Sequence, residues 1–168
     1  MKKIITMLFA AVLTLALTAQ DKDIVDITMS SDNHTTLVSA IETAGLVNIL
    51  KGEGPFTIFA PTNAAFDQLP EGTVSALLKP ESKGQLNNIL TYHVVSGKMM
   101  AADVIAAIKA GGGEAVLETI QGGNLTASLD GDRVKLVDAK GNISYVTSTN
   151  LSGNNGVVHV IDNVLMPS

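Results

Sequence analysis

Apolar side chains follow two different periods along the chain. Residues 32–110 carry them mainly at steps of three and four, which is typical of helices. Residues 114–166 mostly alternate apolar and polar side chains, which is typical of strands. Helices followed by antiparallel strands predict an α+β domain.

The clearest predicted helix covers residues 101–110. Val104 and Ile108 belong to one apolar stripe, and glycines follow the last turn, where helices commonly end. The same spacing predicts two short helices that meet at Ala44-Gly45. A further helix is expected over residues 82–90.

Turn residues divide the second half of the chain into strands. Asp130-Gly131 lies between two alternating runs, which predicts a tight hairpin. Residues 139–142 form a second predicted turn before a strand at residues 143–149. The last strand, residues 157–161, is apolar on both faces apart from His159, so we expect it in the interior of a sheet.

A rigid corner lies in the segment GPFTIFAPTNAAFDQLP. Residues 56–59 predict a buried strand, and Pro61 ends it because proline has no N–H to donate to a ladder. Thr62 or Asn63 is then expected to cap a helix at residues 64–69. Pro61 and Thr62 therefore have an architectural role.

The first 20 residues have the features of a cleavable signal peptide. A cationic head, Met1-Lys2-Lys3, precedes an apolar run from Ile4 to Leu17. That run is shorter than the roughly 18 residues of a membrane span, and the alternative is an uncleaved anchor. We expect export into the periplasm or the extracellular space, with residues 21–168 as a single domain. The chain has no cysteine, which excludes lipoprotein anchoring and disulfides.

Net charge and residue types argue against nucleic-acid binding, metal binding and catalysis. The formal net charge is −5, and loss of the two lysines of the leader takes it to about −7. Phosphate backbones are repelled by such a chain, so we expect no nucleic-acid binding. Three scattered histidines without cysteine give no zinc-ligand spacing, and we expect no metal and no cofactor. Neither a nucleophile elbow nor a cysteine nucleophile is present, so we do not expect an enzyme.

Four stretches resemble, in order, the signatures of the fasciclin (FAS1) family. The corner PFTIFAPTNAAF is similar to the first signature, and residues 155–167 are similar to the second. Residues 90–97, LTYHVVSG, match the Tyr-His motif of the family, and residues 23–46 resemble its amino-terminal helices. The resemblance covers residues 23–167. It implies a wedge-shaped β-sandwich wrapped by several short helices.

The resemblance also implies a secreted adhesion module without enzymatic activity. In animal members the Tyr-His region is tied to integrin recognition, which corresponds here to Tyr92 and His93. We therefore expect a monomer that binds an extracellular or cell-surface protein or glycan near Tyr92, His93 and Asn63. The competing function is a carrier of a small apolar ligand between the helices and the sheet.

The tyrosine and the histidines also have structural interpretations. A buried His93 would need hydrogen-bond partners, and the Thr62-Asn63 corner is a candidate. Tyr92 would pack its ring and keep its hydroxyl in water. His159 has the surroundings of a satisfied core histidine, whereas His34 is expected to be exposed beside a helix start.

Overall fold

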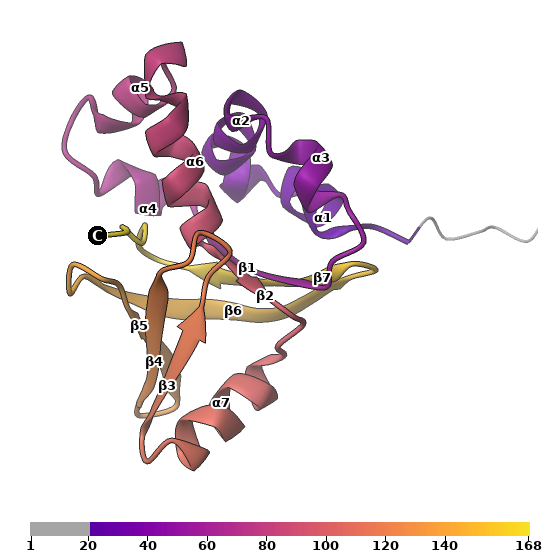
Figure 1. The fold of residues 1–168 in the computed structure, drawn as a ribbon, viewed down its shortest axis with the longest axis vertical. Coiled ribbons are helices and arrows are strands. Elements are labelled where there is room, and N and C mark those ends of the chain that lie inside the picture. Colours follow the sequence, from indigo (N-terminus) through magenta and orange to yellow (C-terminus); the bar gives the residue numbers. More distant parts are fainter. Residues whose placement is uncertain (1–20) are drawn as a thin grey trace, which may run out of the picture.

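The protein is described by a computed structural model over residues 21–168 (Figure 1). The predicted signal peptide, residues 1–20, lies outside the described residues. Helices and one seven-stranded sheet make up the fold, which confirms the α+β prediction. Within residues 21–168, no helix has the length and apolar character that crossing a membrane requires.

Short helices and strands follow one another in an order that the sequence predicted in outline. The helical segments are α1 (Ile24–Met29), η1 (Asp32–His34), α2 (Thr35–Ala44), α3 (Val47–Leu50), α4 (Asn63–Asp67), α5 (Thr73–Leu77), η2 (Pro80–Ser82), α6 (Lys83–Tyr92) and α7 (Ala101–Ala110). The strands are β1 (Phe56–Pro61), β2 (Val94–Ser96), β3 (Glu114–Glu118), β4 (Asn124–Asp130), β5 (Arg133–Val137), β6 (Ile143–Gly153) and β7 (Gly156–Ile161).

Local chemistry sets several helix ends. α7 has the predicted bounds, and the Asp103 carboxylate accepts a hydrogen bond from the Met100 N–H at 2.9 Å at its start. Gly45 separates α2 from α3 with a φ of 74°, a left-handed conformation that glycine adopts easily. α6 continues beyond its predicted end to Tyr92. This extension places Tyr92 in the last turn of α6 and His93 directly after it.

The sheet has the strand order β2-β1-β7-β6-β5-β4-β3. β1 and β7 are parallel, and the other neighbouring pairs are antiparallel. β7 therefore lies in the interior of the sheet, as predicted. Val95 of β2 and Thr119, the residue directly after β3, form a bridge between the two ends of the strand order, so the sheet nearly closes on itself. The two layers of the expected sandwich are halves of this one sheet.

β6 belongs to both halves of the sheet. Its first residues pair with β5, and the rest of the strand pairs with β7. Its register against β7 shifts between Val146 and Ser148 and again between Ser148 and Leu151. Such irregularities bend and twist a strand, which lets one long strand pass from one half to the other.

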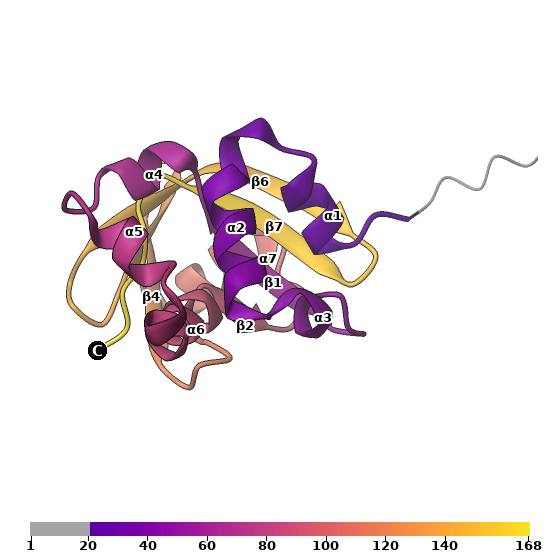
Figure 2. The same cartoon turned by 90° about the horizontal axis from the view of Figure 1, so that it is seen from above.

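Two apolar clusters fill the molecule, one on each face of β1 and β7. The first lies between these strands and α1 to α6, and Ile58 and Ala60 point into it. The second lies between the halves of the sheet and α7, and Phe59 points into it. Figure 1 shows α1 to α6 on one side of β1 and β7 and α7 on the other; Figure 2 shows α1 across β7 from above. Burial on both faces explains why these two strands are apolar throughout.

Candidate functional site

Tyr92 lies in the core and is bonded at its hydroxyl on two sides. Its side chain is fully buried. The hydroxyl donates to the Asn124 carbonyl at 2.6 Å and accepts from the Ala139 N–H at 2.9 Å. Burial raises the pKa of Tyr92. The expectation of a solvated hydroxyl is wrong, because the start of β4 and the β5–β6 turn lie across it.

His93 is buried beside Tyr92 and has a partner at each ring nitrogen. Nδ1 lies 2.8 Å from the Ile89 carbonyl, which can only accept, so Nδ1 carries the proton and donates. Nε2 accepts from the Leu165 N–H at 2.9 Å. The expected partners in the Thr62-Asn63 corner are wrong, since His93 instead joins α6 to the last residues of the chain.

We predict that His93 makes the fold sensitive to mild acid. Burial lowers its pKa from 6.5 to about 4, so the unfolded chain takes up the proton at higher pH than the folded one. The stability that neutral His93 contributes is therefore fully present above pH 6.5 and is lost as the pH falls towards 4. Linkage gives a loss of about 2 kcal/mol between pH 7 and pH 5, measurable by urea unfolding at both values.

The control for this prediction is His93→Gln, which does not titrate in that range. Its free energy of unfolding should change less between pH 7 and pH 5 than that of the unmodified chain. Burial also lowers the pKa values of His34 and His159, so the His93→Gln variant retains part of the pH dependence. Equal pH dependence in the two proteins would contradict the assignment to His93.

The corner at residues 61–63 joins two helices to the sheet. Pro61 is the last residue of β1, and the Thr62 hydroxyl accepts from the Ala65 N–H at 3.2 Å as the N-cap of α4. The helix begins at Asn63, one residue before the predicted start. Asn63 Oδ1 accepts from the Thr36 N–H at 3.0 Å, which caps α2 from outside. Its Nδ2 donates to the Asp32 carbonyl at 3.1 Å. A contact of Asn63 with a partner stays a prediction.

The other two histidines are also buried. Nε2 of His159 donates to the Met99 carbonyl at 2.8 Å, and its ring stacks on Phe59 at 5.7 Å between centroids. These are the surroundings expected of a core histidine. His34 is only 4% exposed, so its predicted exposure is wrong. The η1 turn folds its ring inward, where the Ser31 hydroxyl lies 2.7 Å from Nδ1.

Two buried polar residues were missed by the sequence analysis. Asn155 Oδ1 accepts from the Ile24 N–H, and its Nδ2 donates to the Leu50 and Gly52 carbonyls. Asp138 accepts from four donors in the β5–β6 turn and near the end of the chain. The Asp and Gly spacing of that turn was the available signal, because aspartate commonly bonds to main-chain N–H groups of its own turn.

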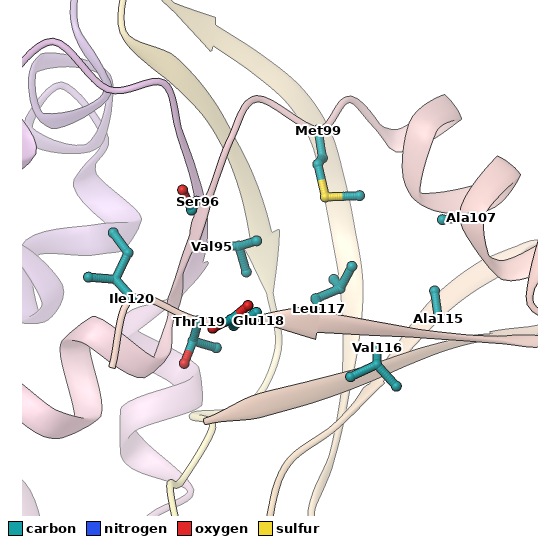
Figure 3. Close-up of a pocket in the computed structure, with 10 residues that line it drawn as sticks. All are labelled: Val95, Ser96, Met99, Ala107, Ala115, Val116, Leu117, Glu118, Thr119 and Ile120. Atoms are coloured by element: carbon teal, nitrogen blue, oxygen red, sulfur yellow. The ribbon is translucent and has the colours of Figure 1, made fainter. Parts of the chain in front are cut away.

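An open groove of ≈ 640 Å³ lies beside the Tyr-His segment, between β2 and β3 (Figure 3). Its floor is apolar, and two large apolar side chains on its β3 side remain in solvent: Val116 is 67% exposed and Ile120 is 41% exposed. Glu118 is the charged member of the lining. The lining residues are Val95, Ser96, Met99, Ala107, Ala115, Val116, Leu117, Glu118, Thr119 and Ile120.

Tyr92 and His93 act on this groove through the main chain. β2 begins directly after His93, and the His93 carbonyl accepts from the Phe59 N–H at 2.9 Å. The two buried side chains thus hold the start of the strand that forms one wall of the groove. Within residues 21–168, no group of three or more His, Asp or Glu residues could hold a metal ion.

The geometry agrees with comparisons to known proteins. The Fasciclin domain family matches residues 32–167. The chain belongs to the fasciclin domain family. Its fold is similar to that of a FAS1 domain pair from the insect cell adhesion molecule Fasciclin I, with a TM-score of 0.77 and 15% identity. That match covers 86% of this fasciclin domain chain and 51% of the pair.

Relatives of this fasciclin domain occur in bacteria and animals. It is 43% identical to protein sll1483 of Synechocystis sp., over 94% of this chain and 81% of the relative. It is 36% identical to immunogenic protein MPB70 of Mycobacterium bovis, over 79% and 63% respectively. It is 34% identical to transforming growth factor-beta-induced protein ig-h3 of Sus scrofa, over 86% of this chain but 19% of the relative.

Proposed function

We propose that this fasciclin domain is exported to the periplasm or the extracellular space. There it binds a protein or glycan of a cell surface or matrix without chemical turnover. The observation that carries the proposal is the form of the groove between β2 and β3, which is open and has one carboxylate in its lining. An acid–base pair or an activated nucleophile needs converging polar groups, and this lining does not supply them. The likeness to a cell adhesion molecule supports the same function.

The proposed binding surface differs from the patch that the sequence suggested. Tyr92 and His93 are 0% and 2% exposed, so their side chains do not form an accessible patch in this structure. We assign the contact instead to the facing edges of β2 and β3, and Tyr92 and His93 hold the start of β2 in place. The 61–63 corner supports the helical side of the fold.

The hollow between α7 and the sheet gives little support to the competing carrier function. The hollow between Phe59, α7 and the second half of the sheet measures ≈ 10 Å³. This is about the space of one water molecule and far below the roughly 300 Å³ of a small-molecule pocket. We therefore keep surface binding as the proposed function.

The test is saturable binding of the labelled protein to its native cell surface and to matrix components. We expect unlabelled protein to compete, and we expect no hydrolysis of esters or glycosides above the buffer rate. Fractionation of the producing cells should place the protein outside the cytosol with its leader removed. Absence of saturable binding, or measurable turnover, would refute the proposal.

A further inference from the structure

The outer edge of β3 presents main-chain groups to the groove. The Thr119 N–H donates back to the Gly123 carbonyl in the turn to β4, at 2.9 Å. The next N–H, that of Ile120, points the other way and donates to the Val94 carbonyl of β2 at 2.8 Å. Main-chain groups alternate in direction along an antiparallel strand. Those of Val116 and Glu118 are therefore directed away from β4: those of Val116 face the groove, and those of Glu118 face β2 beside the Val95–Thr119 bridge.

β2 and β3 diverge next to the Val95–Thr119 bridge. Val95 and Thr119 bridge β2 and β3, but β2 ends at Ser96 while β3 extends back to Glu114. Among the described strands, only β4 pairs with β3 over its full length. The groove occupies the space between the diverging edges. The unpaired edge of β3 therefore offers main-chain groups with which an added strand can form hydrogen bonds.

The side chains around the gap specify the chemistry of such a strand. Ala115 and Leu117 face inward, and Figure 3 shows the Met99 side chain pointing toward Leu117. Residues of an added strand opposite them would enter this apolar floor. Glu114 and Glu118 are exposed on the outward side, so basic side chains opposite them would pair favourably.

A second copy of the chain is a poor occupant of the same edge. Two β3 edges paired antiparallel about Val116 would place Glu114 of one copy opposite Glu118 of the other. Like charges directly opposite each other destabilise a pair of strands. The acidic residues therefore disfavour self-association and favour a basic partner.

We propose that the gap between β2 and β3 binds an extended peptide segment of a partner protein as an added strand. The segment has apolar side chains on its inward face and lysine or arginine at the outward positions opposite Glu114 and Glu118. This inference rests on the proposed function and names the partner class as a protein with an exposed, basic, β-prone segment.

The first test uses synthetic peptides with the protein purified from expression of the full 168-residue chain. The probe contains Lys-Val-Thr-Val-Lys, which presents the same pattern in either direction, and the control contains Glu-Val-Thr-Val-Glu. We expect the basic peptide to bind at least tenfold more tightly, with affinity falling as salt is raised. Absence of binding, or equal binding of the two peptides, would overturn the proposal.

N-methylated versions of the basic peptide test the strand geometry. In an added strand, one alternate set of amides faces β3 and the other set faces away from it. Methylation of one alternate set should weaken binding at least tenfold, since it removes main-chain hydrogen bonds, while methylation of the other set should be tolerated. Equal effects of the two sets would exclude strand addition.

The matching change in the protein is Val116→Pro. Proline is tolerated on an edge strand where the N–H faces away from the ladder, so the fold should be kept. We expect at least tenfold weaker peptide binding with a similar melting temperature. Ile143→Thr, at an exposed apolar residue outside the groove lining, is the control and should bind normally.

Glu118→Gln supplies a second variant that leaves the backbone unchanged. It should lower the salt dependence of peptide binding. Unaltered peptide binding by both groove variants would overturn the inference. If Val116→Pro loses the peptide but still binds the cell surface, the gap is a peptide site but not the adhesive surface. If the protein binds the basic peptide but shows no saturable binding to a cell surface or matrix, the peptide site stands and the proposed surface-binding function is refuted.

Discussion

Replacement of His93 by alanine is expected to lower the free energy of unfolding by about 4 kcal/mol, through a cavity and lost hydrogen bonds. The imidazole is 2% exposed and bonds to the Ile89 carbonyl and the Leu165 N–H. Alanine leaves both main-chain groups buried without their partner. In a domain of this size, the melting temperature should fall by roughly 10 °C, which differential scanning calorimetry would measure.

The His93→Gln variant should lose less stability, because its amide reaches part of the same space and can both donate and accept. Surface binding by each variant should be compared at a temperature where the variant is folded. The structural role predicts that folded His93→Ala retains binding in proportion to its folded fraction. Unchanged stability together with lost binding would instead indicate that His93 contacts the partner directly.

Replacement of Asn155 by alanine is expected to cost about 3 kcal/mol, because three hydrogen bonds are lost at a buried position. The Asn155 amide joins the start of α1, the end of α3 and the β6–β7 turn. Without it, the Ile24 N–H and the Leu50 carbonyl lose a partner in the core. Urea unfolding followed by circular dichroism would measure the difference.

Asn154→Ala is the matched control for this change. Its amide makes one hydrogen bond, to the Asp21 carbonyl at 3.3 Å, and the residue is exposed. An exposed substitution of this kind should alter stability by about 0.5 kcal/mol or less. Similar losses for the two variants would show that the turn itself, rather than the buried amide, is responsible.

Elements with strong local signals could be predicted from the sequence. α7 combines an apolar stripe with an acidic first turn, and Asp130-Gly131 directs a tight hairpin. β7 was assigned to the interior because both of its faces are apolar. The exact length of α6 was not predicted, since its last turn depends on core packing around Tyr92 rather than on a local stop signal.

The surroundings of the site could not be predicted in the same way. The hydroxyl of Tyr92 bonds to residues that lie 32 and 47 positions away in the chain. The second partner of His93 lies 72 positions away. Such contacts depend on how the sheet bends, and the local pattern of apolar and polar residues does not determine that bend. The groove has the same origin, because its walls come from opposite ends of the strand order.

The position of β7 has a consequence for how the chain reaches its folded state. This central strand, Gly156–Ile161, follows the other six described strands in the chain and joins β1, near residue 60, to β6. A growing polypeptide lacks this strand, which lies between the two apolar clusters, until the other six described strands have been made, and such distant pairing is slow to form. The two apolar clusters of a nascent chain therefore lack their shared strand while the rest of the fold is synthesised, a state compatible with the export proposed above.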